Sequence, residues 1–363
     1  MPVSCGIVGL PNVGKSTLFS ALSAARAEIG NYPFCTIEPN VAVAEVPDGR
    51  LAMIQRHIET QKIVPATVQI VDIAGLVKGA SEGEGMGNQF LANIRECDAV
   101  MQVVRCFGGD RVVREEAVDP VGDAEIVELE LALADLDTVR KAQDRLAKRA
   151  RAGDKEALET LDACAKAAKL LEAGRAARAS AWTEREAAAL KPICLMTMKP
   201  MLYVANVADD DLDGAGSLAQ ALRKHAARQA CGFITICADL EIALREMPAA
   251  DRAAFMAEMG MKELGLARLV VAVYDLLGLQ TFFTAGPKEI RAWTIRSGWK
   301  APQAAGVIHT DFEKQFIRAE VYSVGDLDEL GTETAIRAAG RLRTEGRDYA
   351  MQEGDVTHFL IGK

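Results

Sequence analysis

The sequence lacks the features of several broad protein classes. Its eight cysteines include no C-x-x-C pair and its four histidines have no zinc-binding spacing, so we expect reduced thiols and no zinc site. No run of about 18 apolar residues could cross a membrane, and a strand-like run begins within three residues of the start, which leaves no signal peptide. Positive charge is not in excess: the net charge is -9, which argues against nucleic-acid binding through global charge but leaves room for a local basic patch. We therefore predict a cytoplasmic protein without membrane contact.

A glycine loop near the start is the strongest motif that is present. It reads GLPNVGKS over Gly9–Ser16, after an apolar strand-like run and before a segment with helical spacing. Such a loop directs successive backbone N–H groups and a lysine toward the phosphates of a nucleoside triphosphate. Its serine hydroxyl suits a Mg²⁺ ion that bridges those phosphates. The predicted nucleotide contacts of this loop are Asn12, Val13, Gly14, Lys15, Ser16 and Thr17.

Two further positions complete the predicted phosphate and metal site. Thr36 lies in a turn-rich loop between the first helix and the next strand, where a threonine can ligate Mg²⁺ and sense the γ-phosphate, or can be an ordinary loop residue. Asp72 ends a buried strand and is followed three residues later by Gly75, the pattern of a second metal ligand and a phosphate sensor. We predict metal ligands at Ser16, Thr36 and Asp72, and catalytic roles for Lys15, Thr36 and Gly75.

The residue after Gly75 bears on the rate of hydrolysis. Many nucleotide switches place a water-orienting glutamine there, whereas this chain has Leu76, which forms no hydrogen bond. Hydrolysis is therefore expected to be slow or to use other groups. Asn12 is one candidate, because its amide could help to hold a K⁺ ion against the phosphates.

The middle of the chain has a different composition. Residues 123–190 are rich in alanine and charged residues and contain no strand-like run, which predicts an antiparallel helical hairpin. Its apolar stripe is expected at Ile126, Leu129, Leu133, Leu136, Leu158, Leu161, Ala165, Ala168 and Leu171. Basic residues gather near the tip, at Arg145, Lys148, Arg149, Arg151 and Lys155. They could contact RNA phosphates or form a solvated helix face, and composition alone favours the solvated face.

Strand patterning resumes after the hairpin and brings a candidate base site. Two buried strands, over 199–205 and 232–236, are followed by polar residues at their carboxyl ends. The first gives an N-x-x-D sequence in which Val207 replaces the lysine of guanine-specific sites. The predicted base contacts are Asn206, Val207, Asp209, Cys237 and Ala238.

Taken together, GLPNVGKS, Thr36, the DIAG motif followed by leucine, the segment LVKGASEGEGMGNQF and the N-x-x-acid site resemble the Obg-like ATPase family, also called YchF. The resemblance covers nearly the whole chain, including FFTAGPKEIRAWTI and EGDVTHFLIG, which are similar to that family's TGS domain. It implies a mostly parallel α/β P-loop NTPase fold of the GTPase type, interrupted by a coiled-coil hairpin and followed by a β-grasp (TGS) domain. The implied boundaries are 1–122 with 191–278 for nucleotide binding, 123–190 for the hairpin and 279–363 for the TGS domain.

The resemblance also implies an activity. It predicts Mg²⁺-dependent hydrolysis of ATP in preference to GTP and association with ribosomes, with RNA contacts through the hairpin and the TGS domain. Two residues depart from the family's pattern: Asp209 replaces a glutamate, so that GTP could also bind, and Arg114 replaces a histidine. The expected function is a slow nucleotide switch on the translation machinery. The alternative is a scaffold or regulatory binding protein in which hydrolysis is incidental.

Overall fold

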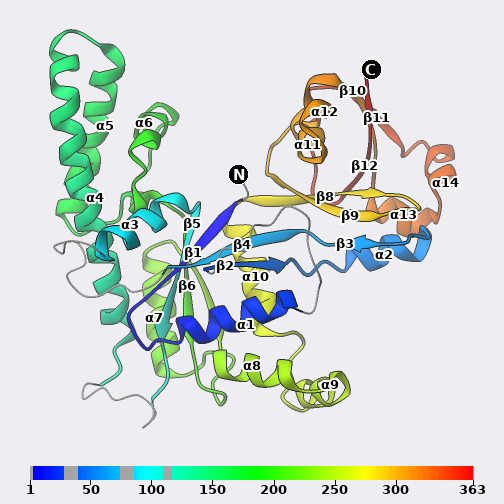
Figure 1. Cartoon of the computed structure of the whole chain (residues 1–363), viewed down its shortest axis with the longest axis horizontal. Helices are drawn as coiled ribbons and strands as arrows, with labels where there is room; N and C mark the ends of the chain where they lie inside the picture. Colours follow the sequence, from blue (N-terminus) through cyan, green and yellow to red (C-terminus); the bar gives the residue numbers. More distant parts are fainter. Residues whose placement is uncertain (1–2, 28–39, 74–85, 109–116, 363) are drawn as a thin grey trace. The chain divides into compact units, whose positions relative to one another are not determined.

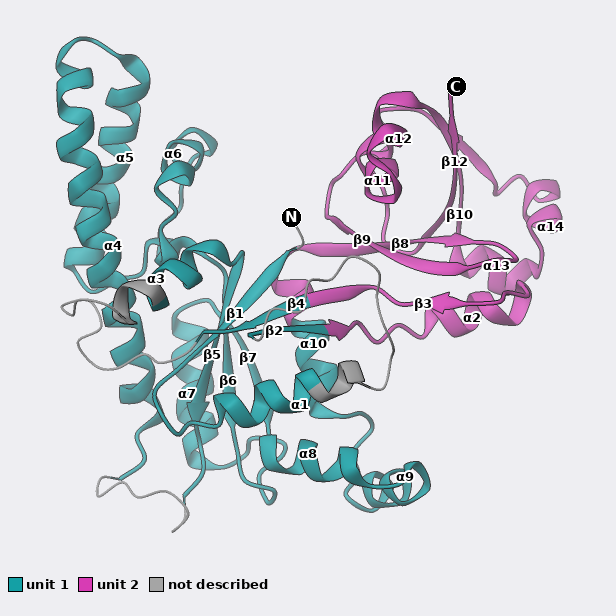
Figure 2. Cartoon of the chain, in the orientation of Figure 1, with its two compact units in different colours: residues 1–43, 69–272 teal, residues 44–68, 273–363 magenta. Residues whose placement is uncertain are grey.

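The computed structural model describes residues 3–27, 40–73, 86–108 and 117–362 (Figure 1). The chain divides into two compact units, residues 1–43 with 69–272 and residues 44–68 with 273–363 (Figure 2). The division differs from the implied boundaries, because residues 44–68 and 273–278 belong with the C-terminal unit and the hairpin lies within the first unit. The largest difference is residues 44–68. Pairing of strand β3 (Ile63–Val64) with β9 (Ile290–Arg296) explains the difference.

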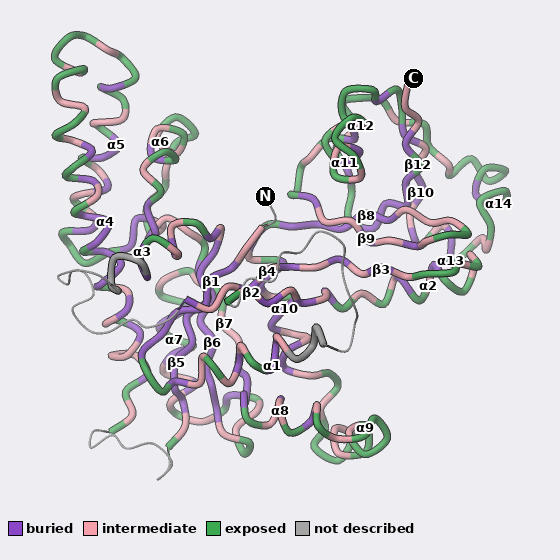
Figure 3. The backbone as a smooth tube through the Cα atoms, viewed as in Figure 1, coloured by how far each residue is buried: buried purple, intermediate pink, exposed green. Residues whose placement is uncertain are grey.

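A six-stranded sheet forms the centre of the first unit. Its strand order is β2-β4-β1-β5-β6-β7, and β1 pairs in parallel with both β4 and β5, as do β5 with β6 and β6 with β7. Strands β5 and β6 are buried along their whole length (Figure 3), which matches their mostly apolar sequences, AVMQVVR and MLYVAN. The strands are β1 (Ser4–Val8), β2 (Val41–Glu45), β4 (Thr67–Asp72), β5 (Ala99–Arg105), β6 (Met201–Asn206) and β7 (Gly232–Ile236).

Helices connect these strands and pack beside the sheet. Helix α1 contacts α8, while α7 contacts α4 and the strands β6 and β7. The helices are α1 (Lys15–Ala27), α3 (Met86–Glu96), α7 (Ser217–Arg228), α8 (Ala238–Glu246), α9 (Ala249–Glu258) and α10 (Gly265–Leu276). Parallel strands joined by helices confirm the predicted α/β class.

The predicted helical hairpin is present between β5 and β6. It consists of α4 (Pro120–Arg151) and α5 (Lys155–Glu172), followed by α6 (Glu184–Leu190) and the short turns η1 (Ala177–Ala179), η2 (Lys191–Ile193) and η3 (Met196–Met198). The turn at the tip is fixed by Asp154, whose carboxylate accepts hydrogen bonds from the N–H of Ala157 and from Arg149.

The apolar stripe predicted for the hairpin is wrong at several positions. Leu129, Leu133 and Leu158 are 52%, 44% and 45% exposed. The prediction is confirmed at Leu136 and Leu171, which lie in the packed seam. The other residues of the seam are Val139 and Ala142 of α4 and Ala163, Cys164 and Ala167 of α5. Leucine and alanine are so frequent in these helices that more than one stripe fits a 3.6-residue period, and α4 also packs against β5 and α7.

The second unit is built on a mixed sheet with the order β11-β10-β12-β8-β9-β3. Its strands are β3, β8 (Leu279–Ala285), β9, β10 (Phe316–Ser323), β11 (Arg343–Glu345) and β12 (Asp355–Ile361), and its helices are α2 (Arg50–His57), α11 (Ala301–Ile308), α12 (Thr310–Gln315), α13 (Val324–Leu330) and α14 (Glu333–Ala338). Phe282, Phe316 and Phe359 lie in the core beneath α11.

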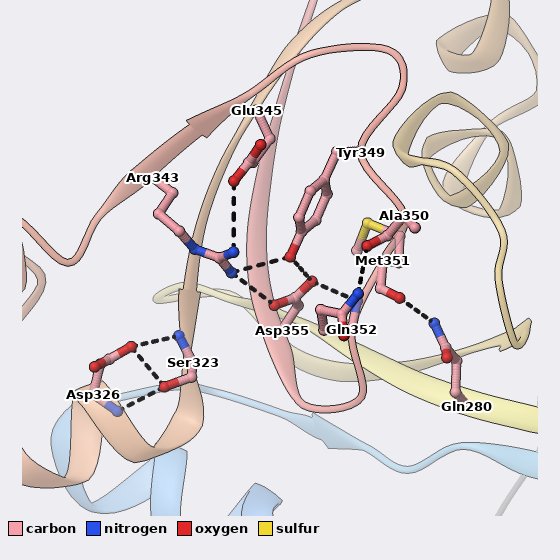
Figure 4. A network of polar contacts seen from close by, with 10 residues as sticks. All are labelled: Gln280, Ser323, Asp326, Arg343, Glu345, Tyr349, Ala350, Met351, Gln352 and Asp355. Carbon is pink, nitrogen blue, oxygen red and sulfur yellow. Dashed lines mark hydrogen bonds and ion pairs between the residues drawn. The ribbon is translucent and has the colours of Figure 1, made fainter.

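A polar network organises one end of that sheet (Figure 4). The hydroxyl of Tyr349 donates to Asp355 over 2.8 Å, and Arg343 donates to both of these residues. The N–H of Gln352 also donates to Asp355, over 2.9 Å. Asp355 is therefore a buried carboxylate with several donors, as a buried charge requires.

Candidate nucleotide-binding site

The predicted phosphate loop connects β1 to α1. Gly9 and Gly14 have φ angles of 151° and 95°, and Asn12 has a φ of 63°. A Cβ at Gly9 would collide with the carbonyl oxygen of Val103, and one at Gly14 would collide with the Asn206 amide. Both glycines are therefore required by the backbone and by their neighbours.

Lys15 and Asp72 come together beside this loop. The Lys15 ammonium donates to the Leu10 carbonyl over 2.7 Å. Burial lowers the pKa of Lys15, and the negative charge of Asp72 partly opposes that shift. Burial likewise raises the pKa of Asp72, against the effect of Lys15. Each group thus gains from an opposite charge, which phosphate oxygens and a cation would supply.

The donors near this pair suit a magnesium ion. Ser16 is exposed in the first turn of α1, and Asp72 is the last residue of β4. A hydroxyl and a carboxylate are oxygen ligands of the kind that Mg²⁺ prefers while it keeps several waters. Clusters of three or more histidine, cysteine or acidic side chains, which could form an all-protein metal site, are absent from the part of the chain that the structure describes.

Asn206 joins the phosphate loop to the opposite side of the site. Its amide nitrogen donates to the Val13 carbonyl over 3.0 Å, and its amide oxygen accepts from the N–H of Ala238 over 3.1 Å. The side chain is 5% exposed. Since an amide has two N–H donors and two lone pairs, Asn206 keeps one of each for a ligand.

A pocket of about 580 Å³ opens beyond Asn206. Among the predicted base contacts, Asn206, Val207, Asp209 and Cys237 line it. Ala238 contributes the backbone N–H that binds Asn206. The lining comes from the carboxyl ends of β5, β6 and β7, where ligands of parallel sheets bind, and from the first turns of α8. The remaining lining residues were not predicted from the sequence; they are Phe107, Gly108, Ala208, Asp239, Leu240 and Ala243.

Phe107 is held in this pocket by a buried arginine. The Arg105 guanidinium lies 4.9 Å from the centre of the Phe107 ring, and its Nε donates to the Phe107 carbonyl over 3.1 Å. Arg105 is only 5% exposed. Burial strengthens the attraction between a cation and an aromatic ring. The signal in the sequence was an aromatic residue two positions after the end of a buried strand.

Some predicted residues lie outside the described ranges. They are Thr36, Gly75, Leu76 and Arg114, together with most of the glycine-rich segment. Asn12, the candidate for K⁺ binding, is described and is exposed at the tip of the loop. Among the described helices, none combines the length and apolar character needed to span a bilayer.

The fold and the loop define a P-loop nucleoside triphosphatase of the GTPase type. Residues 4–141 match a family described as "50S ribosome-binding GTPase", and residues 279–362 match the family YchF-GTPase_C, described as "Protein of unknown function (DUF933)". The chain belongs to the YchF family.

Full-length relatives support this assignment. "Ribosome-binding ATPase YchF" of Escherichia coli O157:H7 is 48% identical over 362 residues, covering 99% of both chains, and the Bacillus subtilis protein of the same name is 46% identical with the same coverage. The solved YchF GTPase of Schizosaccharomyces pombe has a TM-score of 0.89 at 36% identity and covers 99% of this chain and 97% of its own.

Proposed function

We propose that this protein is a slow ATP-hydrolysing switch that binds ribosomes. The observation that carries the proposal is the buried amide of Asn206, which ties the phosphate loop at Val13 to the base side of the site at Ala238. One side chain thereby sets the spacing between the two halves of a nucleoside triphosphate site. The names of the full-length relatives support both the nucleotide and the ribosome as partners.

Within the site, we assign the phosphates to the loop. Backbone N–H groups of Val13, Gly14 and the start of α1 would bind them, with Lys15 adding a positive charge. Thr17 lies in the first turn of α1 and would contribute its N–H. Thr36 and Gly75 are proposed to contact the γ-phosphate. Asn206 and Asp209 would bind the base edge, and Val207, Cys237 and Ala238 would surround it.

Two ions are part of the proposal. Bound Mg²⁺ would neutralise charge on the β- and γ-phosphates, with Ser16, Thr36 and Asp72 as its ligands or as holders of its waters. A K⁺ ion near Asn12 would add positive charge where a glutamine is missing. Equal turnover in sodium and potassium buffers would contradict the K⁺ site.

Different parts of the chain are proposed to bind the nucleotide and the ribosome. Residues 1–122 and 191–278 would bind nucleotide, and residues 123–190 and 279–363 would contact ribosomal RNA as hairpin and TGS domain. Lys148, Arg151 and Lys155 are exposed near the hairpin tip, where phosphates could reach them. Because its partner is the ribosome, we place the protein in the cytoplasm.

The base preference is tested by titration. Purified protein is titrated with labelled ATP and GTP side by side in Mg²⁺ buffer, followed by measurement of steady-state hydrolysis of each. We expect ATP to bind at least as tightly as GTP and to be hydrolysed slowly. A large preference for GTP would contradict the ATP assignment.

The alternative, a scaffold with incidental hydrolysis, is favoured by Leu76. The two functions differ in whether nucleotide state changes ribosome affinity. Co-sedimentation with ribosomes is compared in a non-hydrolysable ATP analogue and in ADP. A switch binds with different affinity in the two states, and equal affinity would establish the scaffold.

A further inference from the structure

One row of side chains on α4 is exposed from the base of the hairpin to its tip. Residues four apart lie on one helix face, and the row is Leu129, Leu133, Asp137, Lys141, Arg145 and Arg149, all of them exposed. Two leucines stand toward the base and three basic residues toward the tip, with Asp137 between them. A face that was only solvated would not need two leucines with about half of their surface in water.

The row borders a groove. One hollow of about 480 Å³ lies between α3, α4 and the η2 turn, and a second of about 510 Å³ lies between α4, α5 and α6. The two hollows share Arg145, Pro192 and Ile193 in their linings, so they adjoin one another. We call the two hollows together the hairpin groove; its helices α3, α4, α5 and α6 are labelled in Figure 1.

The groove has a partly apolar floor and charged edges. Leu133 and Ile193 provide apolar surface in the first hollow, and Leu146, Ala188 and Ala189 provide it in the second. Five cations line the two hollows, against three carboxylates, in a chain whose net charge is -9. The cations are Arg95, Lys141, Arg145, Arg149 and Arg185, and the carboxylates are Asp137, Glu156 and Glu159.

Two of the cations have neither an ion pair nor a side-chain hydrogen bond within the described chain. Lys141 is paired with Asp137 over 2.7 Å, and Arg149 with Asp154 over 2.7 Å. Arg95 donates to the Thr138 hydroxyl over 3.0 Å. Among the described residues, Arg145 and Arg185 form no such contact, and Arg145 stands where the two hollows join. The groove therefore combines apolar surface with uncompensated positive charge.

We propose that the hairpin groove docks an acidic amphipathic helix of a ribosomal protein; this rests on the proposed ribosome binding. Apolar residues of such a helix would cover Leu133 and the floor, and its carboxylates would pair with Arg145 and Arg185. RNA fits less well, because phosphates and sugars gain nothing from a floor of leucine, alanine and isoleucine. The RNA contacts proposed above use other residues, Lys148, Arg151 and Lys155, which do not line the two hollows.

The groove is also connected to the nucleotide site through α3. This helix begins at Met86, fourteen positions after Asp72, and supplies Leu91 and Arg95 to the groove. Lys199 donates to the Arg95 carbonyl over 2.8 Å, and Arg95 donates to Thr138 of α4. Any shift of α3 with nucleotide state would thus alter one wall of the groove, so docking and nucleotide binding are expected to be coupled.

Photocrosslinking tests which kind of partner lies in the groove. The full chain with Leu133→p-benzoylphenylalanine is mixed with purified ribosomes, irradiated and analysed by mass spectrometry. The matched control is Leu158→p-benzoylphenylalanine, since Leu158 is equally exposed on the same hairpin but is not a groove residue. We expect position 133, and not 158, to crosslink to an acidic helical segment of a ribosomal protein. Crosslinks to ribosomal RNA alone, or none from ribosome-bound protein, would overturn the proposal.

Charge reversal gives an independent measurement. Arg145→Glu with Arg185→Glu should lower ribosome affinity roughly tenfold while basal ATP hydrolysis stays unchanged. The control pair, Lys169→Glu with Arg175→Glu, makes the same charge change beside another hollow of the hairpin and should have little effect. If both pairs bind like the unaltered protein, or lose affinity equally, the groove is not the docking site. If the unaltered protein itself does not bind ribosomes, the proposed function fails as well.

Discussion

The phosphate end and the base end of the candidate site are built in different ways. The phosphate end is one continuous stretch, Gly9–Ser16, with an acid from the neighbouring strand β4. The base end is assembled from residues that follow three separate strands, around Phe107, Asp209 and Cys237. The conformation of the contiguous loop is determined largely by its own glycines. The base end depends on how the strands pair and on the side chains that connect the segments after them.

The two ends differ in how far they tolerate substitution, and so in where nucleotide specificity can change. Substitutions at Gly9 and Gly14 are disfavoured, because both residues have positive φ angles and any side chain there would collide with its neighbours. Base-end residues such as Asp209 and Asp239 are exposed and bound by fewer constraints. We therefore expect changes at the phosphate end to abolish binding and changes at the base end to alter selectivity.

The largest effect is expected at the phosphate end. Lys15→Ala should weaken ATP binding by roughly 100-fold, because a hydrogen bond to a charged group contributes about 1.5–3 kcal/mol. Isothermal titration with ATP and with inorganic tripolyphosphate measures this loss, which should be equal for the two ligands. Lys169→Ala, on the hairpin, is the control. Unchanged tripolyphosphate affinity in Lys15→Ala would show that the loop is not the phosphate site.

Asn206→Ala tests the connection between the two ends. It removes two buried hydrogen bonds, to Val13 and Ala238, and should lower the free energy of unfolding by about 1–3 kcal/mol. Affinity for ATP and for tripolyphosphate should both fall, since the loop loses its support. Asn206→Asp retains the acceptor for the Ala238 N–H, so its ligand affinities are expected to lie between those of the unaltered protein and Asn206→Ala. A loss confined to ATP would mean that Asn206 acts on the base alone.

Arg105→Met should affect only the base end. The substitution removes the guanidinium beside the Phe107 ring and its hydrogen bond to the Phe107 carbonyl. We expect ATP binding to weaken about tenfold, because a desolvated cation–π contact contributes up to about 2 kcal/mol. Tripolyphosphate affinity should not change. Arg105→Lys keeps the charge but not the planar group, and should recover little. Equal losses for both ligands would contradict this division of the site.

The smallest effect is expected at Asp209. Asp209→Glu should raise the ratio of ATP to GTP affinity by about threefold, a change of about 0.7 kcal/mol, because the longer carboxylate is less suited to the guanine edge. Competition between labelled ATP and GTP provides the ratio, and Asp239→Glu, in the same pocket, is the control. A shift toward GTP would reverse the proposed role of this residue.

The phosphate end of the site could be predicted from the sequence more fully than the base end. Gly9, Gly14 and Lys15 lie in one short stretch, so the loop between β1 and α1 could be predicted from the local sequence. The bonds of Asn206 to Val13 and Ala238 span 193 and 32 residues, and no local pattern indicates them. Phe107 was missed because its place in the pocket depends on the pairing of β5 with β6.

The hairpin shows a second limit. Apolar periodicity predicted the helices but chose exposed leucines for the seam, because alanine-rich helices offer several stripes of nearly equal quality. The packed stripe is selected by tertiary neighbours that lie outside the hairpin sequence, among them β5 and α7.

The membership of residues 44–68 in the second unit has a consequence for biosynthesis. Helix α2 and strand β3 leave the translating ribosome early, yet their partners β9 and α13 are made only after residue 272. Protein synthesis proceeds at about 5–20 residues per second, so roughly 10–40 seconds pass between the synthesis of this segment and that of the strands that complete its sheet. The second unit therefore cannot be completed before these later strands have been made, and a fragment that starts at residue 279 would lack the edge strand β3.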